Sequence, residues 1–227
     1  MQDITNQHSV ASASPLATSK VLRNTYALLA MTLLFSAVTA GISMGLGLGR
    51  GTGIIMSIGA LLLIWFVLPR TANSSSGIFV VFGFTGLLGA SLGPILNHYL
   101  ALSNGGALIM QALGGTALVF FSLSAYVLTT RKDFSFMGGF LFVGLMVAIF
   151  AMLGMLVASL FGVQISGLSL AISAVIVLLM SGFILYDTSR IIHGGETNYL
   201  MATVALYLDI YNLFTSLLHL LGALSDD

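Results

Sequence analysis

Charged side chains are scarce in this sequence. Of its 227 residues only 6% are charged, seven Lys or Arg and seven Asp or Glu, whereas 58% are hydrophobic. So few charges cannot build a water-facing surface for a chain of this length, and most of it must therefore face lipid. The formal net charge at pH 7 is zero, which argues against nucleic acid as a partner.

Cysteine is absent, and this excludes a disulfide framework, a thiolate metal site and a cysteine nucleophile. A cleavable signal is also not expected, because residues 1–19 are polar and rich in Ser and Thr. The apolar run that starts at Val21 is too long for a signal-peptide core. We therefore expect a flexible cytoplasmic tail at residues 1–19, followed by a single transmembrane domain at residues 20–227.

Seven apolar segments follow the tail, each near the roughly 20 residues that a helix needs to cross the hydrocarbon core. Strands of a membrane barrel would alternate polar and apolar residues, and these segments do not. The sequence thus predicts an all-α integral membrane protein, a seven-transmembrane-helix bundle with no second domain. The predicted spans are 21–45, 52–69, 77–99, 106–129, 135–160, 166–188 and 199–223.

The Lys and Arg residues gather in alternate connections between these spans. With the N-terminus inside, the cytoplasmic side holds six of the seven cations and the outer side only Arg50, which agrees with the positive-inside rule. An odd number of helices then puts the C-terminus outside. The six cytoplasmic cations are Lys20, Arg23, Arg70, Arg131, Lys132 and Arg190.

Glycine recurs at intervals of three or four residues in two predicted helices. Such stripes favour close packing of neighbouring helices, with a flexible gating helix as the alternative. Two G-x-S-x-G matches, at 41–45 and 89–93, lie inside continuous apolar helices and lack the strand and sharp turn of a nucleophile elbow. We therefore attribute both to chance. The stripes are Gly41, Gly45 and Gly49, and Gly86, Gly89 and Gly93.

Two carboxylates fall within the predicted spans. Asp187 lies at the inner end of the sixth span, and Asp209 lies ten residues beyond Tyr199 in the seventh, about 15 Å deep at ~1.5 Å per residue. A charge inside the membrane is costly, so both are candidates for function. The alternative for Asp187 is a simple ion pair with Arg190, which follows three residues later on the same helix face.

Polar residues continue from Asp209 along one face of the last predicted helix. Asn212, Ser216 and His219 follow it at i+3, i+7 and i+10, which is a single helical stripe. This stripe suggests a hydrated pathway from mid-membrane to the outer end, and the alternative is an interhelical hydrogen-bond seam without permeation. We take His219 as an interfacial histidine, because no second His or carboxylate lies one turn away to share a metal.

Several stretches resemble the transmembrane Bax-inhibitor-motif family. They are Tyr186-Asp187-Thr188, the segment 206–209 and the triplet 212–214. Three further stretches, 115–121, 124–133 and 191–199, are similar to the bacterial YccA branch of that family. The resemblance covers nearly the whole chain after about residue 18.

The resemblance implies a seven-helix bundle whose last helix is central, in the inner (plasma) membrane of a bacterium. Some members conduct Ca2+ as a pH-sensitive leak controlled by two aspartates, which match Asp187 and Asp209 here. An arginine of the second helix is thought to lock the first aspartate, and Arg70 is the candidate. The YccA branch instead implies a substrate and modulator of the membrane-bound AAA protease FtsH. Its best-known member lacks the aspartate pair, so this sequence combines features of both groups.

These expectations leave a cation leak and a protease modulator open. An enzyme is not expected: in an intramembrane aspartyl protease two aspartates could share a proton, but the residues before Asp209 are Leu-Tyr-Leu rather than Gly-x-Gly, and the downstream Pro-Ala-Leu motif is missing. No cofactor is expected beyond transient Ca2+ at Asp187 and Asp209. The expected partners are the bilayer, the permeant cation and an FtsH-type protease.

Contact between the two aspartates would couple their protonation. Both cannot ionise cheaply in a low-dielectric site, so a touching pair would hold one shared proton. The predicted helix ends leave the two residues offset in depth, and contact requires the sixth helix to end later or the seventh to begin deeper. Either Arg70 or Arg190 could pair with Asp187 and oppose opening.

Overall fold

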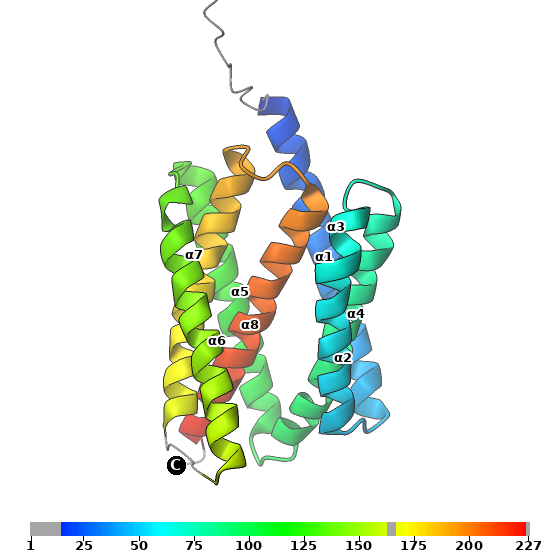
Figure 1. Cartoon of the computed structure of the whole chain (residues 1–227), viewed down its shortest axis with the longest axis vertical. Helices are drawn as coiled ribbons and strands as arrows, with labels where there is room; N and C mark the ends of the chain where they lie inside the picture. Colours follow the sequence, from blue (N-terminus) through cyan, green and yellow to red (C-terminus); the bar gives the residue numbers. More distant parts are fainter. Residues whose placement is uncertain (1–14, 163–166, 226–227) are drawn as a thin grey trace, which may run out of the picture.

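The structure is a computed structural model that describes residues 15–162 and 167–225, and Figure 1 shows its long helices side by side in one bundle. Within these residues seven helices are long and apolar enough to cross a membrane, and no strand is present. The predicted all-α seven-span fold is therefore confirmed. The elements are α1 (Pro15–Gly45), α2 (Arg50–Leu62), η1 (Leu63–Val67), α3 (Leu68–Thr71), α4 (Ser76–Leu100), α5 (Gly105–Thr130), η2 (Ser135–Met137), α6 (Gly138–Leu160), α7 (Leu168–Ile192) and α8 (Tyr199–Ser225).

The first and sixth spans differ most from their predicted bounds. Helix α1 begins at Pro15, before the predicted end of the tail at residue 19, in keeping with the preference of proline for the first turn of a helix. Residues 1–14 of the predicted tail and the predicted start of the sixth span at residue 166 lie outside the described residues. Helix α7 continues to Ile192, four residues beyond its predicted end.

The second span is one continuous rod made of α2, a π-helical turn and α3. The π-helical turn covers Leu63–Val67, and Pro69 is the second residue of α3, which follows it. Proline has no N–H, and its ring clashes with the carbonyl four residues earlier, here that of Trp65. The wider π turn takes up this mismatch, so the helix axis continues past the proline.

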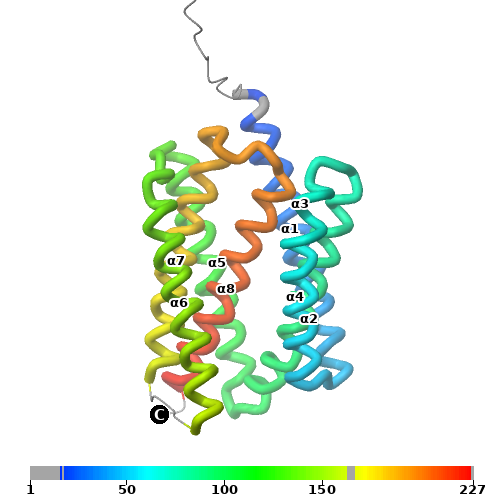
Figure 2. Tube along the Cα trace, viewed as in Figure 1, coloured from blue at the N-terminus to red at the C-terminus, as the bar shows by residue number. Residues whose placement is uncertain are grey.

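Helix α8 is the centre of the bundle. It contacts α1, α4, α5 and α7, whereas α2 packs only on α4 and η1, and α6 packs on α7 and η2. Figure 2 shows its orange-to-red trace crossing the bundle obliquely between the other helices. The expectation of a central last helix is correct.

Close packing between α1 and α4 depends on one of the two glycine stripes. A Cβ atom on Gly89 would collide with the backbone carbonyl of Ser36, and one on Gly93 with the Ser43 hydroxyl. The stripe of α4 therefore lets the two backbones approach, as small residues do in membrane helices. The prediction was wrong for the stripe of α1, because a Cβ on Gly41, Gly45 or Gly49 would meet nothing within 4 Å.

Cationic residues lie mostly at one end of the bundle. The start of α1, the connection α3 to α4, the connection α5 to α6 and the end of α7 are together at the top of Figure 1, and the end of α8 is at the opposite side. Six of the cations belong to these upper segments, and Arg50 begins α2 at the lower end. We call the upper end the cation-rich end.

Candidate functional site

The two membrane aspartates lie together between α7 and α8. Asp187 is 8% exposed and Asp209 is 5% exposed, and their carboxyl groups lie close enough to interact directly. The predicted offset in depth does not separate them, because α7 ends late at Ile192 and α8 runs obliquely across the bundle (Figure 1). An ionised carboxylate can only accept hydrogen bonds, so a hydrogen bond between the two requires a proton on at least one of them.

Asp209 has the more isolated environment of the two. Its Oδ2 atom is buried and has no hydrogen-bond partner, and no basic side chain forms an ion pair with it among the described residues. A buried oxygen without a partner is costly. This oxygen is therefore free to take a proton or to bind a cation.

Arg190 connects Asp187 to the loop between α7 and α8. One guanidinium nitrogen lies 3.7 Å from Asp187 Oδ1, and another lies 3.5 Å from Glu196 Oε2. The guanidinium also lies over the ring of Tyr186, 5.5 Å from its centroid. The positive charge is thus shared between a buried carboxyl group and an exposed loop.

Glu196 was not recognised as part of this site from the sequence. It follows Arg190 by six residues, beyond a turn in which Gly194 has a φ of 77°. Such a φ favours glycine and turns the chain back, so that the carboxylate reaches Arg190. The Gly-Gly pair at 194–195 was the available signal for this return.

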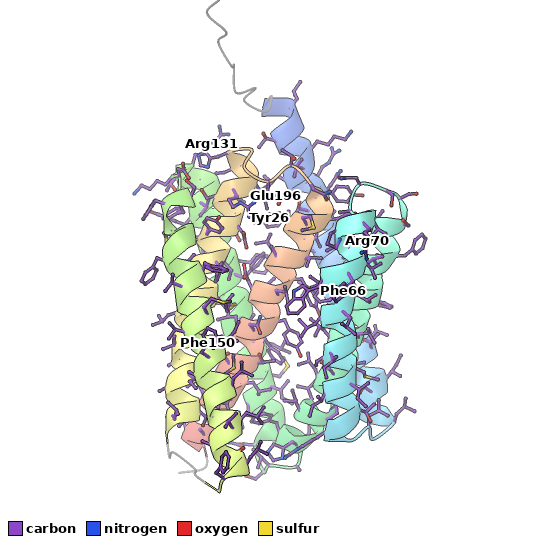
Figure 3. The ribbon with its side chains drawn as sticks, in the orientation of Figure 1. Tyr26, Phe66, Arg70, Arg131, Phe150 and Glu196 are labelled. Carbon is purple, nitrogen blue, oxygen red and sulfur yellow. The ribbon has the colours of Figure 1, made fainter. Side chains whose placement is uncertain are left out.

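Arg70 lies elsewhere in the structure. Its guanidinium donates to the carbonyl oxygen of Phe66 at 2.6 Å, and its short helix α3 contacts α4 and η1 but not α7. Figure 3 shows Arg70 and Phe66 on one side of the bundle and Arg131 on the other. Of the two predicted arginine partners, the structure brings only Arg190 to Asp187.

The end of α7 is held by the connection between α5 and α6. The backbone N–H of Phe134 donates to Ser189 Oγ at 2.9 Å, and Nε2 of His193 lies 3.1 Å from the carbonyl oxygen of Arg131. The Ser135 backbone N–H, which donates to Asp133, lowers the pKa of that exposed carboxyl group. These contacts fix the last turn of α7, and with it the position of Asp187.

The polar stripe of α8 faces α7 for part of its length. His219 Nδ1 lies 2.8 Å from the hydroxyl of Ser173 on α7, Asn212 donates to the carbonyl of Leu208 on its own helix, and Ser216 is buried. The stripe is thus packed against protein in this structure. A hydrated pathway along it would require α7 and α8 to separate.

Two tyrosines on α8 flank Asp209 and join the helix to α1 and α4. The Tyr207 hydroxyl bonds with Ser36 at 2.6 Å and donates to the Thr85 carbonyl, and the Tyr211 hydroxyl lies 3.0 Å from Ser91. These buried hydrogen bonds fix the rotation of α8 about its axis.

The described residues contain no cluster of three or more His, Asp or Glu side chains that could hold a metal. Among the carboxylates that the structure describes, only Asp187 and Asp209 lie adjacent to each other inside the bundle. Hard divalent cations such as Ca2+ take six to eight oxygen ligands. The pair alone is therefore suited to a passing cation that keeps most of its water, rather than to a permanent metal site.

These features define a multi-pass membrane protein in which the last two helices enclose a pair of carboxyl groups. A family model described as "Inhibitor of apoptosis-promoting Bax1" matches residues 18–226. The chain belongs to this Bax inhibitor family, as its sequence motifs predicted.

Relatives over nearly the full length agree with this membership. The chain is 54% identical to "Modulator of FtsH protease YccA" of Escherichia coli over 94% of both chains. It is 50% identical to an uncharacterized membrane protein of Vibrio cholerae over 93% of both chains. It is 51% identical to an uncharacterized protein of Pseudomonas aeruginosa over the whole of both chains. The family and the named relative are described as an inhibitor and a modulator, not as enzymes.

Proposed function

We propose that this protein is a pH-sensitive cation leak, with Ca2+ as the permeant ion, controlled by the pair Asp187 and Asp209. The observation that carries the proposal is the contact between two buried carboxyl groups on the helix at the centre of the bundle and its neighbour. Charged groups inside membranes mark ion and proton pathways. The unpartnered Oδ2 of Asp209 adds an available ligand atom.

Proton loss from the pair is the opening step of this mechanism. In the closed state one carboxyl group donates to the other and holds α7 against α8. Loss of the shared proton removes the donor and places two negative charges side by side, which repel each other strongly in a low-dielectric site. Separation of the helices relieves this repulsion and exposes carboxylate oxygens, which are the ligands that Ca2+ prefers.

Arg190 opposes this opening. Its guanidinium lies between Asp187 and Glu196, so it can pair with the ionised Asp187 while α7 and α8 are still together and reduce the repulsion that separates them. We infer that this ion pair stabilises the deprotonated aspartates in the closed arrangement, and that Glu196 weakens this effect by competing for the same cation.

Flux measurements at several pH values test the proposal. The protein is reconstituted into vesicles that contain a Ca2+-sensitive dye, and influx is compared for wild type, Asp187→Asn and Asp209→Asn. Wild type should conduct more as the pH rises, whereas both variants should lose this dependence because the shared proton is gone. Asp3→Asn is the control, since it removes a carboxylate from the predicted tail, outside the transmembrane domain. Identical pH profiles for wild type and both variants of the pair would contradict the proposal.

We further propose that the protein lies in the inner membrane of a bacterium with its cation-rich end in the cytoplasm. A relative with 54% identity is named "Inner membrane protein YccA". Six of the seven Lys and Arg residues lie at one end of the bundle, and cytoplasmic ends carry such an excess.

A second candidate function is modulation of an FtsH-type protease, with the N-terminal tail as the segment that the protease grips. The name of the Escherichia coli relative supports it. Deleting residues 1–14 leaves all the described helices whole, so insertion should persist while degradation by the protease slows. A tail of the same composition in scrambled order should restore degradation. If the deletion variant is degraded as fast as the full chain, the tail is not the handle.

A further inference from the structure

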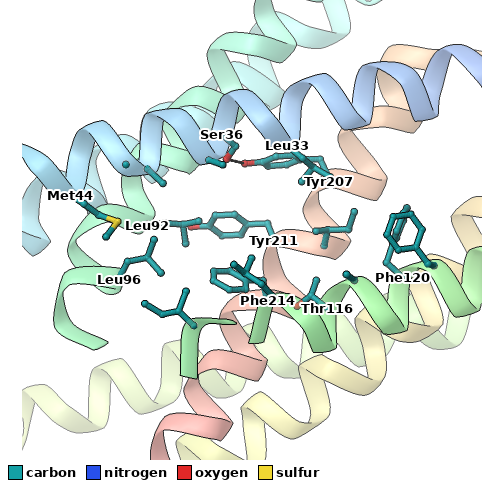
Figure 4. A pocket seen from close by; sticks show the side chains of 18 residues that line it. Leu33, Ser36, Met44, Leu92, Leu96, Thr116, Phe120, Tyr207, Tyr211 and Phe214 are labelled. Atoms are coloured by element: carbon teal, nitrogen blue, oxygen red, sulfur yellow. Dashed lines mark hydrogen bonds between the residues drawn. The ribbon is translucent and has the colours of Figure 1, made fainter. Parts of the chain in front are cut away.

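A cavity of about 400 Å³ lies on the side of α8 that is turned away from the aspartate pair. Its walls come from α1, α4, α5 and α8, and Figure 4 shows the rings of Tyr211 and Phe214 projecting toward Leu92 and Leu96, and the ring of Tyr207 reaching Ser36. None of the predicted pathway residues lines it. We propose that this cavity is a binding site for one acyl chain of a membrane lipid.

The cavity opens toward the bilayer between α1 and α5. The backbones of these two helices stay apart, and the rings of Tyr26 and Phe120 meet across the gap with their centroids 6.1 Å apart, although residues of both helices line the cavity. On α5, Leu113 is 48% exposed and Phe121 is 66% exposed. In a chain whose helices cross the membrane, the medium outside this gap is hydrocarbon. The cavity is thus continuous with the lipid-facing surface.

Polar atoms in the cavity wall already have partners within the protein. The hydroxyls of Tyr207 and Tyr211 bond with Ser36 and Ser91, and the hydroxyl of Thr116 donates to the carbonyl of Ala112. Among the described residues, the buried polar atoms without partners belong to Thr25, Tyr26, Ser43 and Asp209, and none of these residues lines the cavity. A buried water needs two to four polar partners. The cavity offers hydrocarbon contacts instead.

The size of the cavity suits a ligand rather than a packing defect. Ligand sites range from about 300 to 1,000 Å³, and an apolar cavity of about 150 Å³ stays dry and already admits a benzene-sized molecule. Gly41 lies in the wall, and a Cβ there would meet nothing within 4 Å. An acyl chain that enters between α1 and α5 supplies apolar contacts along the stretch where the two backbones stay apart.

Photolabelling tests the proposal. The wild-type protein is reconstituted into phosphatidylcholine vesicles in which a small fraction of the lipid carries a diazirine in the middle of one acyl chain. After irradiation, mass spectrometry locates the labelled residues. Labelling should concentrate on the cavity walls of α1 and α5, severalfold above the lipid-facing residues of α6. In Gly41→Leu, the new side chain occupies part of the cavity, and labelling there should fall severalfold toward the level of α6.

The matched control is Gly154→Leu, which also adds a leucine at an open glycine of a membrane helix but lies outside the cavity. It should leave the pattern unchanged. A uniform pattern over all helices, or equal labelling in Gly41→Leu and wild type, would overturn the proposal.

A second measurement does not require the Gly41→Leu variant to fold. The chain has no cysteine, so Ala117→Cys places one thiol in the cavity wall. A thiol in a lipid-filled cavity should not react with a charged, water-soluble maleimide. Rapid reaction would show a hydrated cavity and contradict the acyl-chain site. Neither measurement depends on ion flux, so the acyl-chain site can be refuted or supported independently of the proposed channel function.

Discussion

Replacing Arg190 tests whether this arginine holds the aspartate pair closed, because Arg190 contacts Asp187 whereas Arg70 bonds to Phe66. Arg190→Gln should raise Ca2+ influx in the pH range where the aspartate pair loses its proton. At 3.7 Å, two unit charges interact by about 4.5 kcal/mol at an effective dielectric constant of about 20. The Arg190 side chain is 34% exposed, however, and ion pairs screened by water contribute only about 0.2–1 kcal/mol.

We therefore expect a change of about 1 kcal/mol, which is about fivefold in the ratio of open to closed protein. The assay is dye-reported influx into vesicles at fixed pH. Arg190→Gln should not raise the influx further when Asp187 is already replaced by Asn, because neither protein in that comparison can form the Arg190–Asp187 ion pair. The increase caused by Arg190→Gln should also shrink in high salt, which screens partly exposed charges.

Arg70→Gln is the matched control, because it removes the same charge from a residue that bonds to the Phe66 carbonyl and lies on a helix without contact to α7. Its basal influx should equal that of wild type. An increase with Arg70→Gln and none with Arg190→Gln would refute the assignment of Arg190 as the opposing charge.

Two further predictions concern topology and packing. Reporter fusions in the segments 70–76 and 190–198 should report the cytoplasm and a C-terminal fusion the outside, and a cytoplasmic C-terminus would contradict the orientation inferred from the cations. Gly89→Ala should destabilise the protein by about 1–3 kcal/mol, the usual cost of overpacking, because its Cβ would collide with the Ser36 carbonyl. Thermal unfolding in detergent measures this effect. Gly45→Ala is the control, because a Cβ at Gly45 would meet nothing within 4 Å. Equal stability of the two variants would show that α1 and α4 can move apart without cost.

Much of the fold could be predicted because the bilayer restricts the choices. Once the apolar segments are recognised, only their ends and neighbours remain to be found. The late end of α7 at Ile192 was missed because Ser189, Arg190 and His193 look like residues of a loop. Their side chains instead bond to the connection before η2 and to Glu196, so the helix gains polar partners beyond the hydrophobic segment.

The site was predictable in its residues but not in its contacts. Two carboxylates inside a membrane are conspicuous in any sequence, and their meeting depends on the oblique course of α8, which periodicity does not reveal. The sequence could not show which arginine pairs with Asp187. Arg190 lies on the same helix as Asp187, whereas Arg70 could pair with it only if α3 packed against α7, and these two helices do not touch. The stripe at Gly41 and Gly45 misled, because spacing shows which residues share a helix face but not whether that face meets a helix or lipid.

The central place of α8 has a consequence for biogenesis. Helix α8 is the last of the described helices to be synthesised, yet it supplies the partners of Ser36, Ser91 and the Thr25 carbonyl through Tyr207, Tyr211 and Thr203. Until it is inserted, the earlier helices surround an unfilled centre and present these polar groups without their partners. A chain that stops short of Tyr199 thus lacks the central helix of its core and leaves uncovered the side chains that α8 packs against in the finished protein.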